Sequence, residues 1–178
     1  MIRSKLFTTA FLVASALLGA SCSKTIDVAE ERRSANEAEF RAFADSTGFE
    51  RVTIPGITGT SFVYMKVTKA GDPNVPVDYT DNVHLFRDTY LTSDWRKEHW
   101  NARRIHQTLG TNAVTPEAVG SLKIGLQIAV QNLHEGAEAT VVIPWYLNNI
   151  NTTTERTEAY TSLYVRLHLA KVIKPATN

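Results

Sequence analysis

Apolar and polar residues alternate along several stretches of the chain, which is the pattern of half-buried β-strands. In the last of these stretches, every second residue from Leu163 to Leu169 is apolar. The others have the same alternation or are rich in β-branched and aromatic residues, and turn-forming sequences lie near their ends. The predicted strands are Ser61–Lys69, Asn82–Leu91, Arg103–Leu109, Ala137–Ile143 and Thr161–Ile173.

Two other segments have apolar residues at helical spacing. The first, Ala29–Ala44, contains good helix formers and is expected to stop near Gly48. The second is expected to run roughly from Pro116 to Leu133, because proline suits the first helical position, and to be closed by Gly136. The face of the second helix that is expected to be buried consists of Leu122, Leu126, Ala129, Val130 and Leu133.

These elements together predict an antiparallel α+β domain, in which four to six strands wrap around the second helix. The helix at Ala29–Ala44 is an addition to that domain. Between the strands, Thr92–Asn101 holds two tryptophans and many charges, and it is expected to be a long surface loop.

The first 21 residues resemble a secretory leader. Basic Arg3 and Lys5 precede an apolar run from Leu6 to Leu18, and small residues follow. The sequence Leu18-Gly19-Ala20-Ser21-Cys22 resembles the lipobox of bacterial lipoproteins, which implies cleavage before Cys22 and lipid on its thiol. The alternatives are an ordinary secretory leader with an incidental cysteine, or a membrane span, although a span needs about 20 apolar residues.

Ser23 and Lys24 follow the cysteine, and no aspartate occupies the next position. By resemblance to lipoproteins of Gram-negative bacteria, this implies a lipid-anchored protein of the cell envelope, at the outer membrane. The expected organisation is a signal peptide at 1–21, a tether with the N-terminal helix at 22–60, and a folded domain at 61–178.

Charge and cysteine content exclude several classes of function. The formal net charge is +1, and removing the leader with Arg3 and Lys5 makes it −1, so binding to nucleic acid is not expected. Cys22 is the only cysteine, which leaves no thiol for a disulfide once it carries lipid. The five histidines form no close ligand pair on one helix, so we expect neither a metal site nor a cofactor.

Three segments, in the right order and at the right spacing, resemble the FKBP-type peptidyl-prolyl cis-trans isomerases. Gly125–Gly136 resembles the family's helix and exit turn, G-[WL]-x-x-[GA]-[VL]-x-x-[ML]-x-x-G. Ala137–Pro144 resembles the next strand, which often ends in Ile-Pro. Leu163–Val172 resembles the terminal strand, whose common form is L-x-F-x-V-x-L-x-x-V.

The resemblance implies an FKBP-like fold that binds proline-containing polypeptides or a protein partner in the envelope. Active members hold the twisted prolyl amide in a dry cup with aromatic walls, which lowers a rotation barrier of about 20 kcal/mol. The residues expected to line such a pocket are Phe86, Trp95, Leu122, Leu126, Tyr146, Tyr164 and Val165.

Several positions depart from the family pattern. The segment Ser93–Glu98 lacks the family's Phe-Asp pair, and Lys123 replaces an apolar lining residue. The family's Tyr-Gly falls at Asn149-Ile150, and Val165 stands where the terminal strand has phenylalanine. Two functions therefore remain open, namely an isomerase of reduced activity that assists the folding of exported proteins, and a non-catalytic binding or surface-structural lipoprotein.

Overall fold

The structure of the protein is a computed structural model that describes residues 27–56, 61–98 and 102–176. The leader and Cys22 lie outside the described residues. The chain divides into two compact units, residues 1–31 and 32–178, and all the strands belong to the second. Among the described residues, no helix is both long and apolar enough to cross a bilayer.

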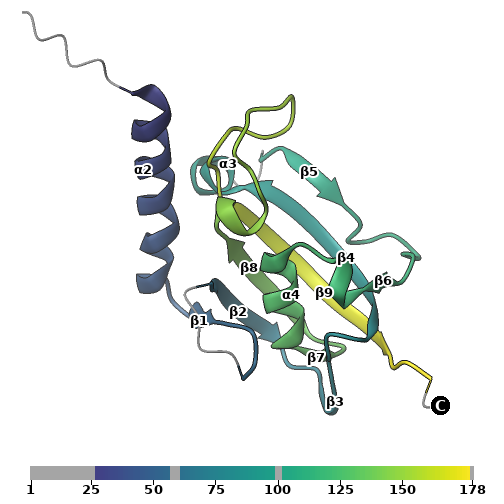
Figure 1. The fold of residues 1–178 in the computed structure, drawn as a ribbon. Coiled ribbons are helices and arrows are strands. Elements are labelled where there is room, and N and C mark those ends of the chain that lie inside the picture. Colours follow the sequence, from purple (N-terminus) through teal and green to yellow (C-terminus); the bar gives the residue numbers. More distant parts are fainter. Residues whose placement is uncertain (1–26, 57–60, 99–101, 177–178) are drawn as a thin grey trace, which may run out of the picture. The chain divides into compact units, whose positions relative to one another are not determined.

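The second unit is built on an antiparallel sheet (Figure 1). Its strands lie side by side in the order β1-β2-β8-β9-β4-β5, and the short strand β6 also pairs with β4. Their bounds are β1 Glu50–Val52, β2 Val63–Lys69, β4 Asn82–Leu91, β5 Arg104–Gln107, β6 Glu117–Ala118, β8 Glu138–Ile143 and β9 Leu163–Ile173. Two further short strands, β3 Asp72–Pro76 and β7 His134–Glu135, form a separate pair.

The α+β class and the five strands expected from alternation are confirmed. The expected number of four to six strands in the sheet is wrong, since the described residues form seven. The strands that were missed, β1 and β6, have three and two residues. Segments this short do not contain enough positions for a period of two to be recognised.

The central helix, α4, covers Ile124–Gln131 and is much shorter than the expected span from Pro116 to Leu133. Strand β6 and a 3-10 turn at Val119–Ser121 occupy the first half of that span, and Leu122 itself is extended. The helix ends at Asn132, whose side-chain amide donates to the carbonyl oxygens of Thr53 and Ile128. Gly136 does not close the helix but has a φ of 83° between β7 and β8, a conformation that glycine adopts without strain.

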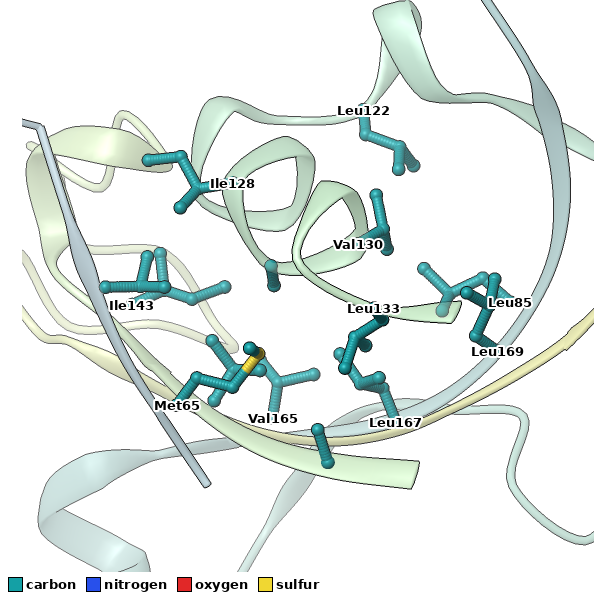
Figure 2. Packing of buried hydrophobic residues seen from close by; sticks show 14 of the residues in the cluster. Met65, Leu85, Leu122, Ile128, Val130, Leu133, Ile143, Val165, Leu167 and Leu169 are labelled. Carbon is teal, nitrogen blue, oxygen red and sulfur yellow. The ribbon is translucent and has the colours of Figure 1, made fainter. Parts of the chain in front are cut away.

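Helix α4 packs on one face of the sheet, and this contact forms the main core (Figure 2). Ile128, Ala129 and Val130 are fully buried there, together with Val165 and Leu167 of β9. Of the five residues expected on the buried face, Leu126 is only partly buried. Leu122 reaches the core from the extended segment before the helix, and Leu126 packs against the core while remaining partly exposed.

The segment that was expected to be a surface loop, Thr92–Asn101, contains a helix instead. Helix α3 covers Thr92–Glu98. The Trp95 ring lies 4.8 Å from that of Tyr90 and 4.3 Å from that of Tyr164. We attribute the helix to this aromatic packing. The many charged residues of the segment had suggested a loop, because they give no sign of these ring contacts.

The N-terminal helix is confirmed. Helix α2 covers Val28–Arg41, and a 3-10 turn at Ala42–Asp45 follows it. The Asp27 carboxylate accepts hydrogen bonds from the backbone N–H groups of Ala29 and Glu30, which is a normal N-terminal cap. Gly48, with a φ of 78°, lies just after the turn, where the stop was expected.

The burial of α4 gives a differential stability prediction. Replacing Ile128 by Ala should lower the free energy of unfolding by about 2–5 kcal/mol, because it leaves a cavity in the core. Replacing Leu126 by Ala should cost about 1–2 kcal/mol, since that side chain keeps part of its surface in water. Urea unfolding of both variants tests the order, and a larger loss for Leu126→Ala would show that the helix is rotated relative to this structure.

Candidate functional site

The sheet has two faces with different chemistry. We call the face covered by α4 the inner face and the opposite one the outer face. Along β9, Val165 and Leu167 are buried on the inner face, whereas Tyr164, Arg166 and His168 lie on the outer face. Cross-strand partners share a face in an antiparallel sheet, so the register of β9 assigns the face of each residue on β4.

The register places Phe86 on the outer face. Phe86 is paired with His168, and the two rings stack at 6.0 Å. The partner of Val165 on β4 is Thr89, which is therefore the inner-face residue at that position. The family resemblance predicts that Phe86 lines the proline-binding cup. In the structure, the β4 residue that lies beside Val165 on the inner face is Thr89.

The inner face next to Thr89 is polar. Arg87 lies opposite Leu167 on β9, and its guanidinium donates two hydrogen bonds to the Glu117 carboxylate, at 2.6 and 3.1 Å. On the neighbouring strand β5, His106 is the partner of Thr89. Burial, and then the nearby Arg87 charge, lower the pKa of His106 below its ordinary value, although Glu117 and Asp88 oppose this. Its neutral form is therefore favoured.

Three of the seven expected pocket residues contribute to the inner face. Leu122 and Val165 are buried in the core, and Leu126 packs against the same core while remaining partly exposed. Ile105 and Ile150 accompany Leu126 as partly buried neighbours of the core. The part of the inner face around Leu126 is thus filled by aliphatic side chains. None of the aromatic residues that were expected to line a cup lies there.

Trp95 and Tyr164 meet on the outer face. Their rings stack at 4.3 Å with an interplanar angle of 14°. They border an open hollow of about 380 Å³, which we call the α3 hollow. Burial raises the pKa of Tyr164, so its hydroxyl stays protonated at neutral pH. The residues that line the α3 hollow are Phe43, Ser46, Phe49, Trp95, Arg96 and Tyr164.

Tyr146 lies in a second hollow of about 390 Å³, which we call the α2 hollow. Its side chain is 40% exposed, and burial of the remainder, followed by the Glu37 charge, raises the pKa of its hydroxyl. Trp145 stands beside it, and the Arg33 guanidinium lies 5.8 Å from the centre of the Trp145 ring. The residues that line the α2 hollow are Arg33, Glu37, Phe40, Arg41, Phe62, Trp145 and Tyr146.

The two hollows belong to one aromatic layer on the outer face. Phe40 and Phe43 pack with Tyr64 and Val142, whose side chains project from the outer face of β2 and β8. The layer buries Val142 completely. Sequence reasoning missed Phe40, Phe62 and Trp145 as possible site residues, because the N-terminal helix was treated as an addition to the domain and not as part of its surface.

The seven expected residues therefore do not gather around one cavity. Three are on the inner face, Trp95 and Tyr164 border the α3 hollow, Tyr146 lines the α2 hollow, and Phe86 lies beside His168. A polar hollow of about 360 Å³ on the outer face includes His168 and Arg166. Within the described ranges, no group of three or more His, Cys, Asp or Glu side chains is arranged to hold a metal ion.

Comparison of the structure with solved structures gives a consistent result. A peptidyl-prolyl cis-trans isomerase from Pseudomonas syringae pv. tomato matches with a TM-score of 0.63 at 18% identity, over 82% of this chain and 96% of its own. FkpA from Escherichia coli matches with a TM-score of 0.62 at 15% identity, over 97% of this chain and 74% of its own. The chain has an FKBP-type fold.

The N-terminal domain of FKBP42 from Arabidopsis thaliana also matches, with a TM-score of 0.51 at 16% identity over 69% of this chain and 99% of its own. The sequence matches no protein-family model and no curated protein. At these identities the likeness concerns the fold, and the chemistry has to be argued from the side chains.

Proposed function

We propose that the chain is an FKBP-type isomerase-like lipoprotein of the bacterial cell envelope, where it assists the folding of exported proteins with strongly reduced prolyl isomerase activity. One observation supports the reduction in activity. The inner face beside Val165 presents Thr89 and the Arg87–Glu117 ion pair, while Phe86 is on the opposite face.

The physical chemistry of the reaction supports this proposal. A twisted prolyl amide has lost its double-bond character, and an enzyme stabilises it in a dry apolar site that grips the proline ring. An ion pair and a threonine hydroxyl attract water to the same place. The family's tyrosine, whose hydroxyl donates to the twisted carbonyl, falls at Asn149, and the nearby Tyr146 lines the α2 hollow with Phe40 and Phe62. Loss of one such donor costs about 2–4 kcal/mol in other enzymes.

A second candidate is a binding lipoprotein with no catalysis. The two aromatic hollows of the outer face favour it, because aromatic rings beside guanidinium groups are suited to contacts with polypeptides. In either case the proposed partners are proline-containing polypeptides or a protein of the envelope, and neither needs a cofactor.

The proposed location rests on the leader and on Cys22. A diacylglycerol and an amide-linked acyl chain on Cys22 would anchor the protein stably, since each buried methylene contributes about 0.8 kcal/mol and one chain alone is marginal. The residues after Cys22 support the outer membrane of a Gram-negative bacterium as the destination.

The isomerase proposal predicts a low rate. The mature protein should catalyse isomerisation of a proline-containing tetrapeptide at least about 100-fold more slowly than the Pseudomonas syringae isomerase assayed beside it, because Thr89 and not an aromatic ring lies opposite Val165 on the inner face. Phe86→Ala should leave the residual rate unchanged, since Phe86 lies on the outer face. Equal rates for the two wild-type proteins, or a large loss in Phe86→Ala, would mean that the inner and outer faces have been assigned incorrectly.

The anchoring proposal predicts that Cys22→Ser abolishes lipidation. The variant should appear in the soluble envelope fraction, whereas the wild-type protein stays with the membranes, and intact-mass measurement should show that the acyl chains are lost. Identical mass and fractionation of the two proteins contradict a lipid anchor at Cys22.

A further inference from the structure

We propose that the aromatic layer of the outer face is a docking surface for an extended, acidic polypeptide segment that carries proline or aromatic side chains. This surface consists of the α2 hollow and the α3 hollow. This docking surface rests on the proposed function in one respect, namely that the bound segment comes from a polypeptide that the protein assists. It does not depend on isomerase activity.

The two hollows are neighbours within one layer. Phe40 lines the α2 hollow and Phe43 lines the α3 hollow, and both belong to the cluster formed with Tyr64 and Val142. The two hollows have volumes of about 390 and 380 Å³, which is near the lower limit for a small-molecule pocket. Two adjacent hollows of this size suit successive side chains of one extended chain better than a single compact ligand.

The rings in both hollows favour proline and aromatic side chains. Trp95 and Tyr164 are nearly parallel, and Trp145 and Tyr146 are nearly perpendicular, with 5.7 Å between their centres. Such surfaces grip flat or rigid rings at low entropic cost, which is how other domains bind proline-rich segments.

The charges of the two linings favour an acidic segment. The two linings together contain the arginines Arg33, Arg41 and Arg96, and the single acid Glu37. Glu37 is shared, because it contacts Arg33 at 3.0 Å and Arg41 at 3.6 Å. The guanidinium of Arg96 lies 4.2 Å from the centre of the Phe43 ring and 3.9 Å from the Glu39 carboxylate.

A further guanidinium strengthens this asymmetry. Arg51 lies 4.2 Å from the centre of the Phe62 ring, at the edge of the α2 hollow. The two linings thus combine aromatic rings with three arginines, and Glu37 is the one carboxylate among the lining residues. A segment with acidic residues beside its ring-bearing residues complements this pattern, whereas a basic segment is repelled.

The test compares two labelled peptides on the full mature chain held in phosphatidylcholine nanodiscs. One peptide is extended and alternates Pro or Phe with Asp, and its twin carries Lys in place of every Asp. We expect the acidic peptide to bind at least about tenfold more tightly by fluorescence anisotropy, and the difference to shrink in high salt. Equal binding of the twins, or tighter binding of the basic one, overturns the charge assignment.

Variants locate the binding surface. Tyr146→Ser and Arg96→Glu should each weaken binding of the acidic peptide by about fivefold or more, because they remove one ring and one cation from the two hollows. Tyr79→Ser and Lys171→Glu are matched controls, since both side chains are exposed and lie outside the two linings. Thermal unfolding verifies that all four variants are folded.

The outcomes separate this proposal from the proposed function. The docking surface is overturned if the two control variants weaken binding as much as Tyr146→Ser and Arg96→Glu do. It is also overturned if neither peptide binds, even when the isomerase rate is as low as expected. Binding that depends on Tyr146 and Arg96 in a protein with a full isomerase rate supports the docking surface and overturns the reduced activity.

Discussion

The close packing of α4 on the inner face of the sheet is the constraint on which the rest of the structure depends. Gly125, at the start of the helix, lies against Ile143 of β8, and a methyl group at this glycine would overlap the Ile143 side chain. Ile128 and Val130 lie on opposite sides of this helix (Figure 2), and both belong to the core cluster that contains the alternating apolar residues of β8 and β9. Because the helix covers one face, every second residue of the strands becomes core, and the intervening residues are left to the outer face.

This division into faces explains the distribution of the candidate site residues. Strands β4 and β9 have ten paired positions, which include Thr89 with Val165 and Phe86 with His168. A register shift between His84 and Leu85 follows the third of these pairs. The extra residue at this shift is Ala170 on β9, so the alternation along β4 is unbroken and places Phe86 on the face opposite to Leu85 and Thr89. The inner face keeps the aliphatic packing of an FKBP-type fold, and most of the aromatic side chains of the sheet gather on the outer face with those of α2 and α3.

Much of the fold could be predicted because its signals are local. The alternation from Leu163 to Leu169 has the period of a strand, and the structure buries these residues as expected. The start of α4 could not be predicted in this way, since Leu122 is buried while extended and therefore imitates a helical spacing. Helix α3 packs through Trp95 on Tyr164, which is distant in the sequence. The local pattern of charged residues gives no information about that contact. The grouping of the aromatic side chains on the outer face could not be predicted, because it depends on contacts between residues that are distant in the sequence.

Hydrogen–deuterium exchange on the full mature chain, with and without the acidic peptide, tests most directly the claim that polypeptides contact the outer face. The account predicts slower exchange in Phe40–Phe49 and in Thr92–Glu98, which contribute to the two hollows, and no change in α4 or in Arg104–Gln107 of β5. Protection confined to α4 and β5, with the outer-face segments unchanged, would contradict the account and restore the inner face as the binding site.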